Sequence, residues 1–355
     1  MAKAKSENKL LKNDKVTILV DYRYVLYRSG FRFNEMQITR NSVTLLTGAI
    51  YGVLELVIMI RQNYPNSKII FCLDGEPTGR LKIFPQYKGQ RHQADPPQEI
   101  VCARKLHDEP IKILKCVDDV EFIKHPNKEA DDLAAIFAYR EKAKGRKALI
   151  FSGDKDYLQM VKDGIMVAKS FESNKFEIMD ENTILAHKDL GVDAKDILYF
   201  RALEGDKSDE IPAAVGGSKD LKREFARYWS ESNDKYLEHY DELLNKFNTE
   251  VIQKMFKGKK AQQNNLEKYL EPAVKEAMIR NIKLMDLQKY KVVYDSYSKY
   301  KESRNKEDLK EAKEFTNGVK LVDFDLSEDD IKKLLRNYQL SRFTIWAKGA
   351  GYLKP

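Results

Sequence analysis

Short apolar runs that end at or near an aspartate recur in the first half of the chain. They are VTILV before Asp21, IIFCL before Asp74 and ALIFSG before Asp154. Runs of this length, partly β-branched and bounded by polar residues, predict strands buried on both faces of a sheet. Amphipathic stretches of helical length, Val43–Gln62 and Ala130–Lys144, precede the second and third runs. The alternation predicts the α/β class, with a mostly parallel central sheet and helices on both of its faces.

The aspartates that follow these runs lie at the carboxyl ends of the predicted strands. In a parallel sheet those ends share one edge, and ligands bind at that edge. Asp21, Asp74 and Asp154 are therefore expected to converge, although they are far apart in the sequence.

Other acids cluster where the pattern predicts helix starts or turns. Taken singly, such acids are commonly N-caps, solvated turn residues or partners of a helix dipole. Taken together, they lie at strand ends and helix starts, which the topology places on the same edge as the three aspartates. The converging set has nine carboxylates: Asp21, Asp74, Glu129, Asp131, Asp132, Asp154, Asp156, Asp206 and Asp209.

So many carboxylates at one edge repel each other unless cations lie between them. Oxygen ligands without histidine or cysteine select Mg²⁺ or Mn²⁺, and this number of carboxylates is enough for two ions. Two neighbouring divalent ions activate water and stabilise the leaving oxygen in phosphodiester hydrolysis. We therefore expect two Mg²⁺ ions, for which Mn²⁺ can substitute, and a phosphodiester substrate.

Composition narrows the class of protein. The 355 residues include 63 Lys and Arg against 55 Asp and Glu, and the net charge of +8 favours a polyanionic partner. The three cysteines lack the spacing of a disulfide framework or a zinc site and suit a reducing compartment. The apolar stretch Leu45–Ile60 is interrupted by polar residues and glycines, which argues against a membrane protein.

The chain is expected to divide into three parts. Residues 1–15 are basic and lack the apolar segment of a secretory signal, which predicts a flexible lead-in. Residues 16–205 form the predicted core, in which a basic, aromatic, turn-rich segment begins near residue 76 and projects from the sheet edge. Residues 206–355 are rich in lysine and glutamate and are predicted to be a helical region.

Six segments follow one another in the chain: ILVDYRYVLYR, TGAIYGVLE, FCLDG with TGR and YKGQR, EADDLAA, SGDKDYLQMV and LEGDKSDEIP. In this order and spacing they resemble the 5′-nuclease family, which includes flap endonucleases, bacterial polymerase-associated 5′–3′ exonucleases and phage ribonuclease H enzymes. The resemblance runs from Val16 to Gly217 and more loosely to the end. It implies a fold of the PIN and 5′-nuclease type, in which residues 16–205 are the metal-dependent nuclease core and a helical arch spans about 76–125. It further implies that residues 206–355 bind duplex and contain a helix-hairpin-helix and a C-terminal extension.

The end of the chain has a pattern of its own. In LVDFDLSEDDIKKLLRNYQL a short apolar run precedes Ser327 and Asp330, whose spacing predicts a capping box that opens a helix. The same segment resembles the phage ribonuclease H branch of the family, so a bacteriophage source is expected.

The resemblance implies metal-binding roles for all nine acids. The metal-ligand positions of the family are matched by Asp21, Asp74, Glu129, Asp131, Asp154 and Asp156. The additional carboxylates around the second ion or its waters are matched by Asp132, Asp206 and Asp209.

The resemblance also implies contacts with nucleic acid. Lys88 and Arg91 match the catalytic lysine and arginine of the arch, and Arg80 matches an arginine ahead of it. Residues at i and i+3 share a helix face and can reach one phosphate, although a solvated surface pair is the alternative. Tyr87 and Tyr22 are candidates for stacking on bases or, equally, for packing alone.

Three segments depart from the family. Tyr22-Arg23-Tyr24 replaces small or amide residues, so the terminal nucleotide is expected to be accommodated differently. In the hairpin, Ala213-Ala214-Val215 replaces glycines, while Gly216, Gly217 and Lys219 remain as predicted nucleic-acid contacts. Backbone N–H groups cradle a phosphate best where glycines allow close approach, so duplex binding and a K⁺ site there are in question. Glu210 replaces an asparagine, and it either perturbs the second metal site or faces solvent.

Two patterns in the last third have more than one explanation. A lysine cluster suits either the duplex backbone or a solvated helix face, and it consists of Lys254, Lys257, Lys259 and Lys260. A tyrosine series at i, i+4 and i+7 suits a stacking strip or, more commonly, a half-buried helix stripe, and it consists of Tyr290, Tyr294 and Tyr297.

These observations predict a structure-specific 5′ nuclease, a 5′–3′ exonuclease or flap endonuclease that removes flaps or RNA primers in DNA replication or repair. Its expected partner is DNA with a 5′ flap, a nick or an RNA primer, with a single-strand DNA-binding protein or the replication machinery as further candidates. We expect a monomer in the cytoplasm, the host cytoplasm if the source is a phage. Two alternatives are a PIN-type single-strand ribonuclease, which would lack the arch and the helical second half, and a non-catalytic junction-binding relative, against which the complete acidic set argues.

Overall fold

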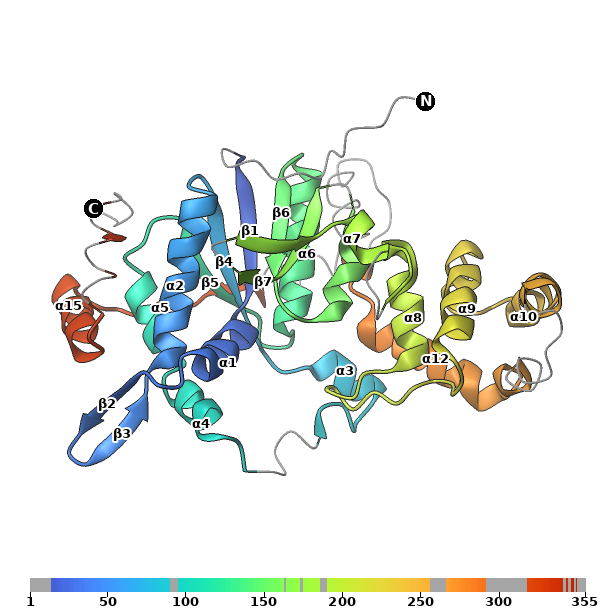
Figure 1. The fold of residues 1–355 in the computed structure, drawn as a ribbon, viewed down its shortest axis with the longest axis horizontal. Coiled ribbons are helices and arrows are strands. Elements are labelled where there is room, and N and C mark those ends of the chain that lie inside the picture. The colour runs from blue at the N-terminus through green and yellow to red at the C-terminus, as the bar shows by residue number, and fades with distance from the viewer. Residues whose placement is uncertain are drawn as a thin grey trace.

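The computed structural model describes residues 14–89, 95–162, 164–172, 175–185, 190–255, 266–291 and 318–340, with Phe343, Trp346, Ala347 and Gly349. At its centre is a seven-stranded sheet in the order β8-β7-β6-β1-β4-β5-β9 (Figure 1). The strands are β1 (Val16–Asp21), β4 (Lys68–Leu73), β5 (Val120–Lys124), β6 (Lys147–Phe151), β7 (Ile165–Glu172), β8 (Lys175–Met179) and β9 (Lys320–Leu321). β8 and β9, at the two edges, run antiparallel to their neighbours and the inner strands run parallel. The prediction of a mostly parallel sheet is confirmed.

Apolar side chains leave both faces of this sheet, as the continuous apolar runs require. In β1, Ile18 and Val20 pack on one face and Leu19 packs on the other. The helices on the first face are α1 (Tyr22–Arg32), α2 (Gly48–Asn63), α4 (Gln98–Lys105) and α5 (Glu109–Leu114). The second face is covered by α6 (Ala130–Ala143), which contacts β1, β4 and β6 and coincides with the predicted Ala130–Lys144.

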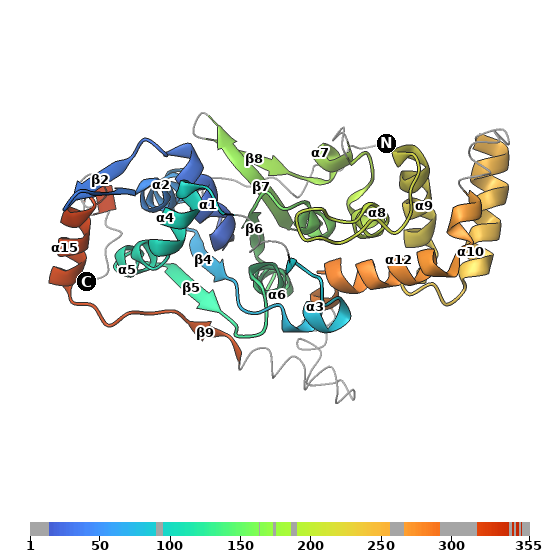
Figure 2. The same ribbon diagram turned by 90° about the horizontal axis from the view of Figure 1, so that it is seen from below.

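A helical part extends the core beyond α6 (Figures 1 and 2). Its elements are η2 (Lys155–Met160), α7 (Glu181–Leu185), η3 (Ala194–Asp196), α8 (Ile197–Glu204), α9 (Lys219–Glu231), α10 (Tyr240–Phe247), the π-helical η4 (Asn248–Met255) and α12 (Pro272–Met285). Asn281 of α12 donates to the carbonyls of Ala202 (2.8 Å) and Pro212 (2.9 Å), which ties α12 to α8 and to the turn after it. Within the described ranges, no helix is both long and apolar enough to span a membrane.

A two-stranded ribbon occupies the start of the predicted helix Val43–Gln62, so that part of the prediction is wrong. β2 (Gln37–Arg40) and β3 (Val43–Leu46) pair antiparallel and extend away from the sheet (Figure 1). Asn41 and Ser42 between them have φ of 48° and 61°, the left-handed geometry of a tight two-residue hairpin turn. The helix therefore begins only at Gly48, after the exposed, β-branched start of the segment.

Most of the stretch predicted as an arch, about 76–125, belongs to the packed core in the structure. β5 lies inside the sheet between β4 and β9, and α4 and α5 pack on α1 and α2. Their apolar residues, among them Ala103, Ile111 and Phe122, are buried. The projecting stretch thus consists of α3 (Thr78–Ile83) and the turns that follow it, up to residues 90–94, which lie outside the described part.

The last described segment returns to the sheet. β9 pairs with β5 through Leu321 and Ile123, and α15 (Glu328–Asn337) packs against α5 (Figure 2). Ser327 Oγ accepts a hydrogen bond from Asp330 N (3.2 Å), and Asp330 accepts one from Ser327 N (3.0 Å). The predicted capping box is confirmed, and the predicted region 206–355 is divided between the helical part and the sheet.

Candidate active site

The ends of three neighbouring strands bring three of the predicted carboxylates together. Asp21 ends β1 and caps α1, Asp74 follows β4, and Asp154 follows β6 and caps η2. The strand register pairs Asp21 with Cys72 and Val20 with Phe151, so all three ends lie at the same level of the sheet.

Hydrogen bonds from neutral groups hold these strand ends in place. Ser152 Oγ and Tyr24 N each donate to Asp21 at 3.1 Å. Ala130 N, in the first turn of α6, donates to Asp74 Oδ1 at 2.9 Å. This last bond places the acids at the start of α6 beside the end of β4.

Arg80 of α3 is buried, with 6% of its surface exposed, among the acids at the start of α6. Its terminal nitrogens contact Glu129 and lie 2.6 Å from Asp131 and 3.2 Å from Asp132, and its Nε donates to the carbonyl of Leu284 at 2.9 Å. One guanidinium thus compensates three carboxylates, as its planar array of donors allows. In this conformation Arg80 holds the acids together instead of facing solvent, where nucleic acid would reach it.

Lys88 and Tyr87 connect Glu129 to the turn after α8. Lys88 Nζ lies 2.5 Å from Glu129 and 3.5 Å from Asp209. The hydroxyl of Tyr87 lies 3.0 Å from each of the same two carboxylates. The side chain of Tyr87 is only 4% exposed, so here it packs and does not present its ring for stacking.

Arg201 of α8 joins the remaining acids to the group. Its Nε lies 2.8 Å from Asp156, and its Nη2 contacts Asp206, which also accepts a bond from Ser208 Oγ at 2.6 Å. Acids from five separate segments are therefore linked into one network at the carboxyl edge of the sheet.

Burial and repulsion raise the pKa of four of these carboxyls, one of which is Asp156, where burial outweighs the charge of Arg201. Burial and the charge of Asp74 raise the pKa of Asp21 to about 6, and burial raises the pKa of Asp131 to about 7 despite Arg80. Burial and Asp156 raise the pKa of Asp154 well above its usual range. At Asp132, by contrast, burial opposes ionisation but Arg80 outweighs it and lowers the pKa. The site holds more negative charge than the cations of the chain compensate.

The donor chemistry fits hard divalent cations, because every donor is a carboxylate oxygen and part of the charge is uncompensated. Within the described part of the chain, however, no three metal-ligating side chains are arranged around one point. The oxygens of seven carboxylates are engaged instead with Arg23, Arg80, Lys88 and Arg201. Binding of a cation therefore requires some of these ion pairs to rearrange.

For three residues of this network, no pattern in the surrounding sequence predicts the contacts that they make. Arg201 and Arg23 contact acids from other segments, and Arg23 Nε lies 2.9 Å from Asp74. Tyr290, from the predicted tyrosine series, is buried and donates to Asp132 at 2.9 Å. The commoner explanation of that series, a buried stripe, holds for this tyrosine.

The other predicted contacts with nucleic acid are not part of the network. Tyr22 is buried, and its ring packs edge-on against Phe71 and Phe122. Gly216, Gly217 and Lys219 are exposed at the turn that leads into α9. Several predicted residues or their side chains lie outside the described part of the chain: Arg91, Lys254, Lys257, Lys259, Lys260, Tyr294 and Tyr297.

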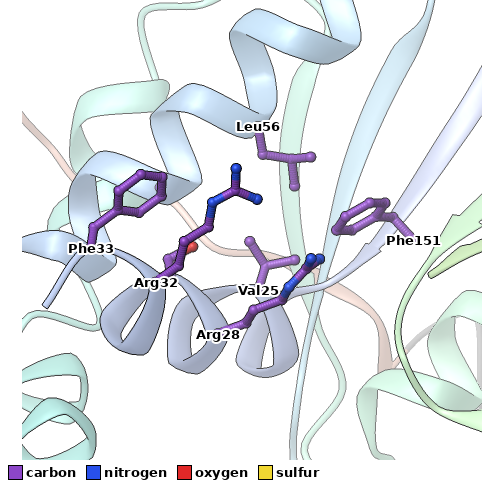
Figure 3. Close-up of a pocket in the computed structure, with 8 residues that line it drawn as sticks. Val25, Arg28, Arg32, Phe33, Leu56 and Phe151 are labelled. Carbon is purple, nitrogen blue, oxygen red and sulfur yellow. The ribbon is translucent and has the colours of Figure 1, made fainter. Parts of the chain in front are cut away.

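Two hollows lie away from the carboxylates. One, of about 20 Å³, lies between α1 and α2, and Figure 3 shows Arg28 and Arg32 of α1 extending towards Phe151 and Leu56 beside it. Its volume suits about one water molecule and excludes a nucleotide. The other, of about 450 Å³, is lined by the end of α6, α7 and η3 and contains none of the nine acids. Neither hollow is the candidate site.

Known proteins resemble this chain in sequence. The sequence profile of the 5′-3′ exonuclease N-terminal, resolvase-like domain matches residues 16–189. A 5′-3′ exonuclease of Buchnera aphidicola subsp. Acyrthosiphon pisum is 32% identical over 205 residues, which are 57% of this chain and 66% of that protein. A 5′-3′ exonuclease of Aquifex aeolicus is 29% identical over 221 residues, 62% of this chain and 72% of that protein.

The fold is also found in a solved structure. A flap endonuclease of bacteriophage T5, in a complex with DNA and metal ions, superimposes with a TM-score of 0.53 at 17% identity. The superposition covers 92% of this chain and 98% of that one. The matched segments span about two thirds of the length of the two exonucleases. On its profile match, its relatives and its sheet, this chain belongs to the 5′-nuclease family.

Proposed function

We propose that this protein is a structure-specific 5′ nuclease that hydrolyses phosphodiester bonds as a 5′–3′ exonuclease or flap endonuclease. The observation that carries the proposal is the meeting of nine carboxylates from five segments at the carboxyl edge of a parallel sheet. The match to the exonuclease domain supports it, because seven of the nine acids lie within residues 16–189.

Two Mg²⁺ ions are the proposed cofactors, and Mn²⁺ is expected to substitute for them. The proposed ligands are Asp21, Asp74, Glu129, Asp131, Asp154 and Asp156. The proposed surrounding carboxylates are Asp132, Asp206 and Asp209. When bound, such ions lower the pKa of a water molecule and neutralise charge on the leaving oxygen.

The chain's own cations would orient the scissile phosphate. Lys88 is the candidate nearest to the acids, and Arg91, three residues further on, is proposed to reach the same phosphate. Charge-assisted hydrogen bonds from a lysine and an arginine fix a phosphate firmly. Because such contacts go to phosphates, the sequence of bases is expected to matter little. The segment around these residues would select structure by admitting single strands.

DNA with a 5′ flap, a nick or an RNA primer is the proposed substrate. The related fold of the phage T5 flap endonuclease, solved with DNA and metal ions, supports this choice. The exposed Gly216, Gly217 and Lys219 are proposed to contact the duplex, with a K⁺ ion at the same turn. Arg80 is proposed to act through the carboxylates that it holds.

We infer the biological setting from the proposed nuclease activity. Primer and flap removal in DNA replication or repair fits a 5′ nuclease, with a single-strand DNA-binding protein or the replication machinery as partners. We further propose a monomer that acts in the cytoplasm and derives from a bacteriophage.

Cleavage of four 5′-labelled DNAs tests the proposal: a flap, a nicked duplex, a blunt duplex and an RNA-primed duplex. Each is incubated with the protein in Mg²⁺, in Mn²⁺ and in EDTA. We expect cleavage near the 5′ end or the flap junction in both metals and none in EDTA. Activity that persists in EDTA, or that is confined to single-stranded RNA, would contradict the proposal.

A further inference from the structure

Arg23 lies in the first turn of α1, between the carboxylate edge and solvent. Its Nε is 2.9 Å from Asp74 Oδ2, and its side chain is 49% exposed whereas that of Asp74 is 14% exposed. An arginine has five N–H donors, and this contact uses one of them. Within the described part of the chain, this guanidinium forms no second hydrogen bond or ion pair.

The stability of α1 does not explain a cation at this position. The first turn of a helix favours acids, because its free N–H groups carry partial positive charge. α1 has no acid in its first turn, and Arg23 adds positive charge there. The position of Arg23 is therefore better explained by what lies across from it, which is Asp74.

Both oxygens of Asp74 are engaged. Oδ1 accepts a hydrogen bond from Ala130 N at 2.9 Å, and Oδ2 is paired with Arg23. A divalent cation that binds Asp74 must compete with Arg23 for Oδ2 or lie beside it. Because both are positively charged, each weakens the binding of the other. The exposed arginine is the partner that can move away.

We propose that Arg23 is an exchangeable counter-ion that pairs with Asp74 before metal binds and with a phosphate of the bound strand afterwards. This inference rests on the proposed function, because it takes Asp74 as a metal ligand. The free guanidinium presents a planar fork that matches two phosphate oxygens. Its place beside a metal ligand puts that fork next to the strand that is to be cut.

The exchange couples metal binding to DNA binding. Coupling of two binding equilibria is reciprocal, so a metal that frees Arg23 must bind more tightly when DNA is present. Removing the arginine has opposite effects on the two equilibria. It relieves repulsion of the metal, which tightens metal binding, and it removes a phosphate contact, which weakens DNA binding.

The test compares R23S with wild type and with the control R146S. Arg146 Nε lies 2.5 Å from Glu141, and its side chain is 47% exposed, but it precedes β6 at the opposite edge of the sheet. Metal affinity is measured by titration with Mn²⁺, with the free ion followed by electron paramagnetic resonance. DNA affinity is measured by fluorescence anisotropy of flap DNA in Ca²⁺ and in EDTA, with 5′-phosphate and 5′-hydroxyl ends.

We expect R23S to bind Mn²⁺ at least about threefold more tightly and flap DNA in Ca²⁺ about tenfold more weakly, while R146S matches wild type. A loss confined to the 5′-phosphate flap assigns Arg23 to the terminal phosphate, and an equal loss on both flaps assigns it to a backbone phosphate. If R23S binds Mn²⁺ or flap DNA with the same affinity as wild type, the proposed exchange of Arg23 between Asp74 and a phosphate is wrong. Wild-type protein that binds no Mn²⁺ overturns the proposed function as well.

Discussion

Replacing Arg80 by methionine tests whether buried charge holds the carboxylate network together. Methionine keeps much of the apolar volume but removes the cation that contacts Glu129, Asp131 and Asp132. Removing one partner of a buried ion pair commonly costs about 3–5 kcal/mol, because the other charge stays buried and unpaired. Here three carboxyl groups lose one partner, so we expect the free energy of unfolding in EDTA to fall by about that amount.

Divalent cations should restore part of this loss. An ion that binds only the native state stabilises it by about 2.7 kcal/mol at a hundredfold excess over its Kd. Because R80M leaves more uncompensated negative charge, Mg²⁺ is expected to stabilise the variant more than it stabilises wild type. Urea unfolding followed by circular dichroism, in EDTA and in Mg²⁺, measures both effects.

The control for this experiment is R227M. Arg227 forms a partly exposed i, i+3 ion pair with Glu224 at 2.7 Å, and ion pairs near the surface contribute at most about 1 kcal/mol. If R80M has the same free energy of unfolding in EDTA as wild type, or loses no more than R227M does, the idea that Arg80 compensates the buried acids is refuted.

Three further predictions follow from the same network. In EDTA, the free energy of unfolding should fall as the pH rises from the usual aspartate pKa of 3.8 towards about 7, because native Asp131 still holds a proton that the unfolded chain has released. Asp21, whose pKa is raised to about 6, lowers the free energy of unfolding in the same way between pH 3.8 and about 6. Urea titrations in which stability rises between pH 3.8 and 7 would contradict the argument. Y290F should lower the free energy of unfolding by about 1 kcal/mol, because Asp132 loses a hydrogen bond, and an unchanged urea midpoint would count against that bond. K88A should slow single-turnover flap cleavage roughly 100-fold while changing flap affinity much less, and a normal rate would remove Lys88 from the phosphate contact.

The sheet and the acids at its edge could be predicted because both depend on local patterns. Continuous apolar runs identify strands buried on both faces, and the residue after each run then lies at the carboxyl edge. Asp21, Asp74 and Asp154 follow from this rule alone. The capping box at Ser327 could likewise be predicted from the sequence, because its two partners are only three residues apart.

Contacts between distant segments could not be predicted in this way. Arg80 resembles an exposed arch cation in the sequence, but the packing of α3 against α12 buries it among acids. Tyr290 reaches Asp132 across 158 positions of the chain. The ribbon of β2 and β3 could not be predicted, because its strands are short and the helical spacing of apolar residues in α2 extends back to Val43. These residues depend on tertiary packing, which no local pattern encodes.

The central claim is that the carboxylate edge binds the metal ions that cleave DNA, and D154N tests it most directly. Asp154 caps η2 with its side chain and is not ion-paired in the described structure, so asparagine preserves the local fold while removing a charge. Cleavage of 5′-flap DNA in Mg²⁺ and its binding in Ca²⁺ are measured on the same preparation. We expect cleavage to be abolished and flap affinity to stay within about threefold of wild type, since binding depends mainly on phosphate contacts elsewhere. Cleavage by D154N at the wild-type rate would contradict the claim.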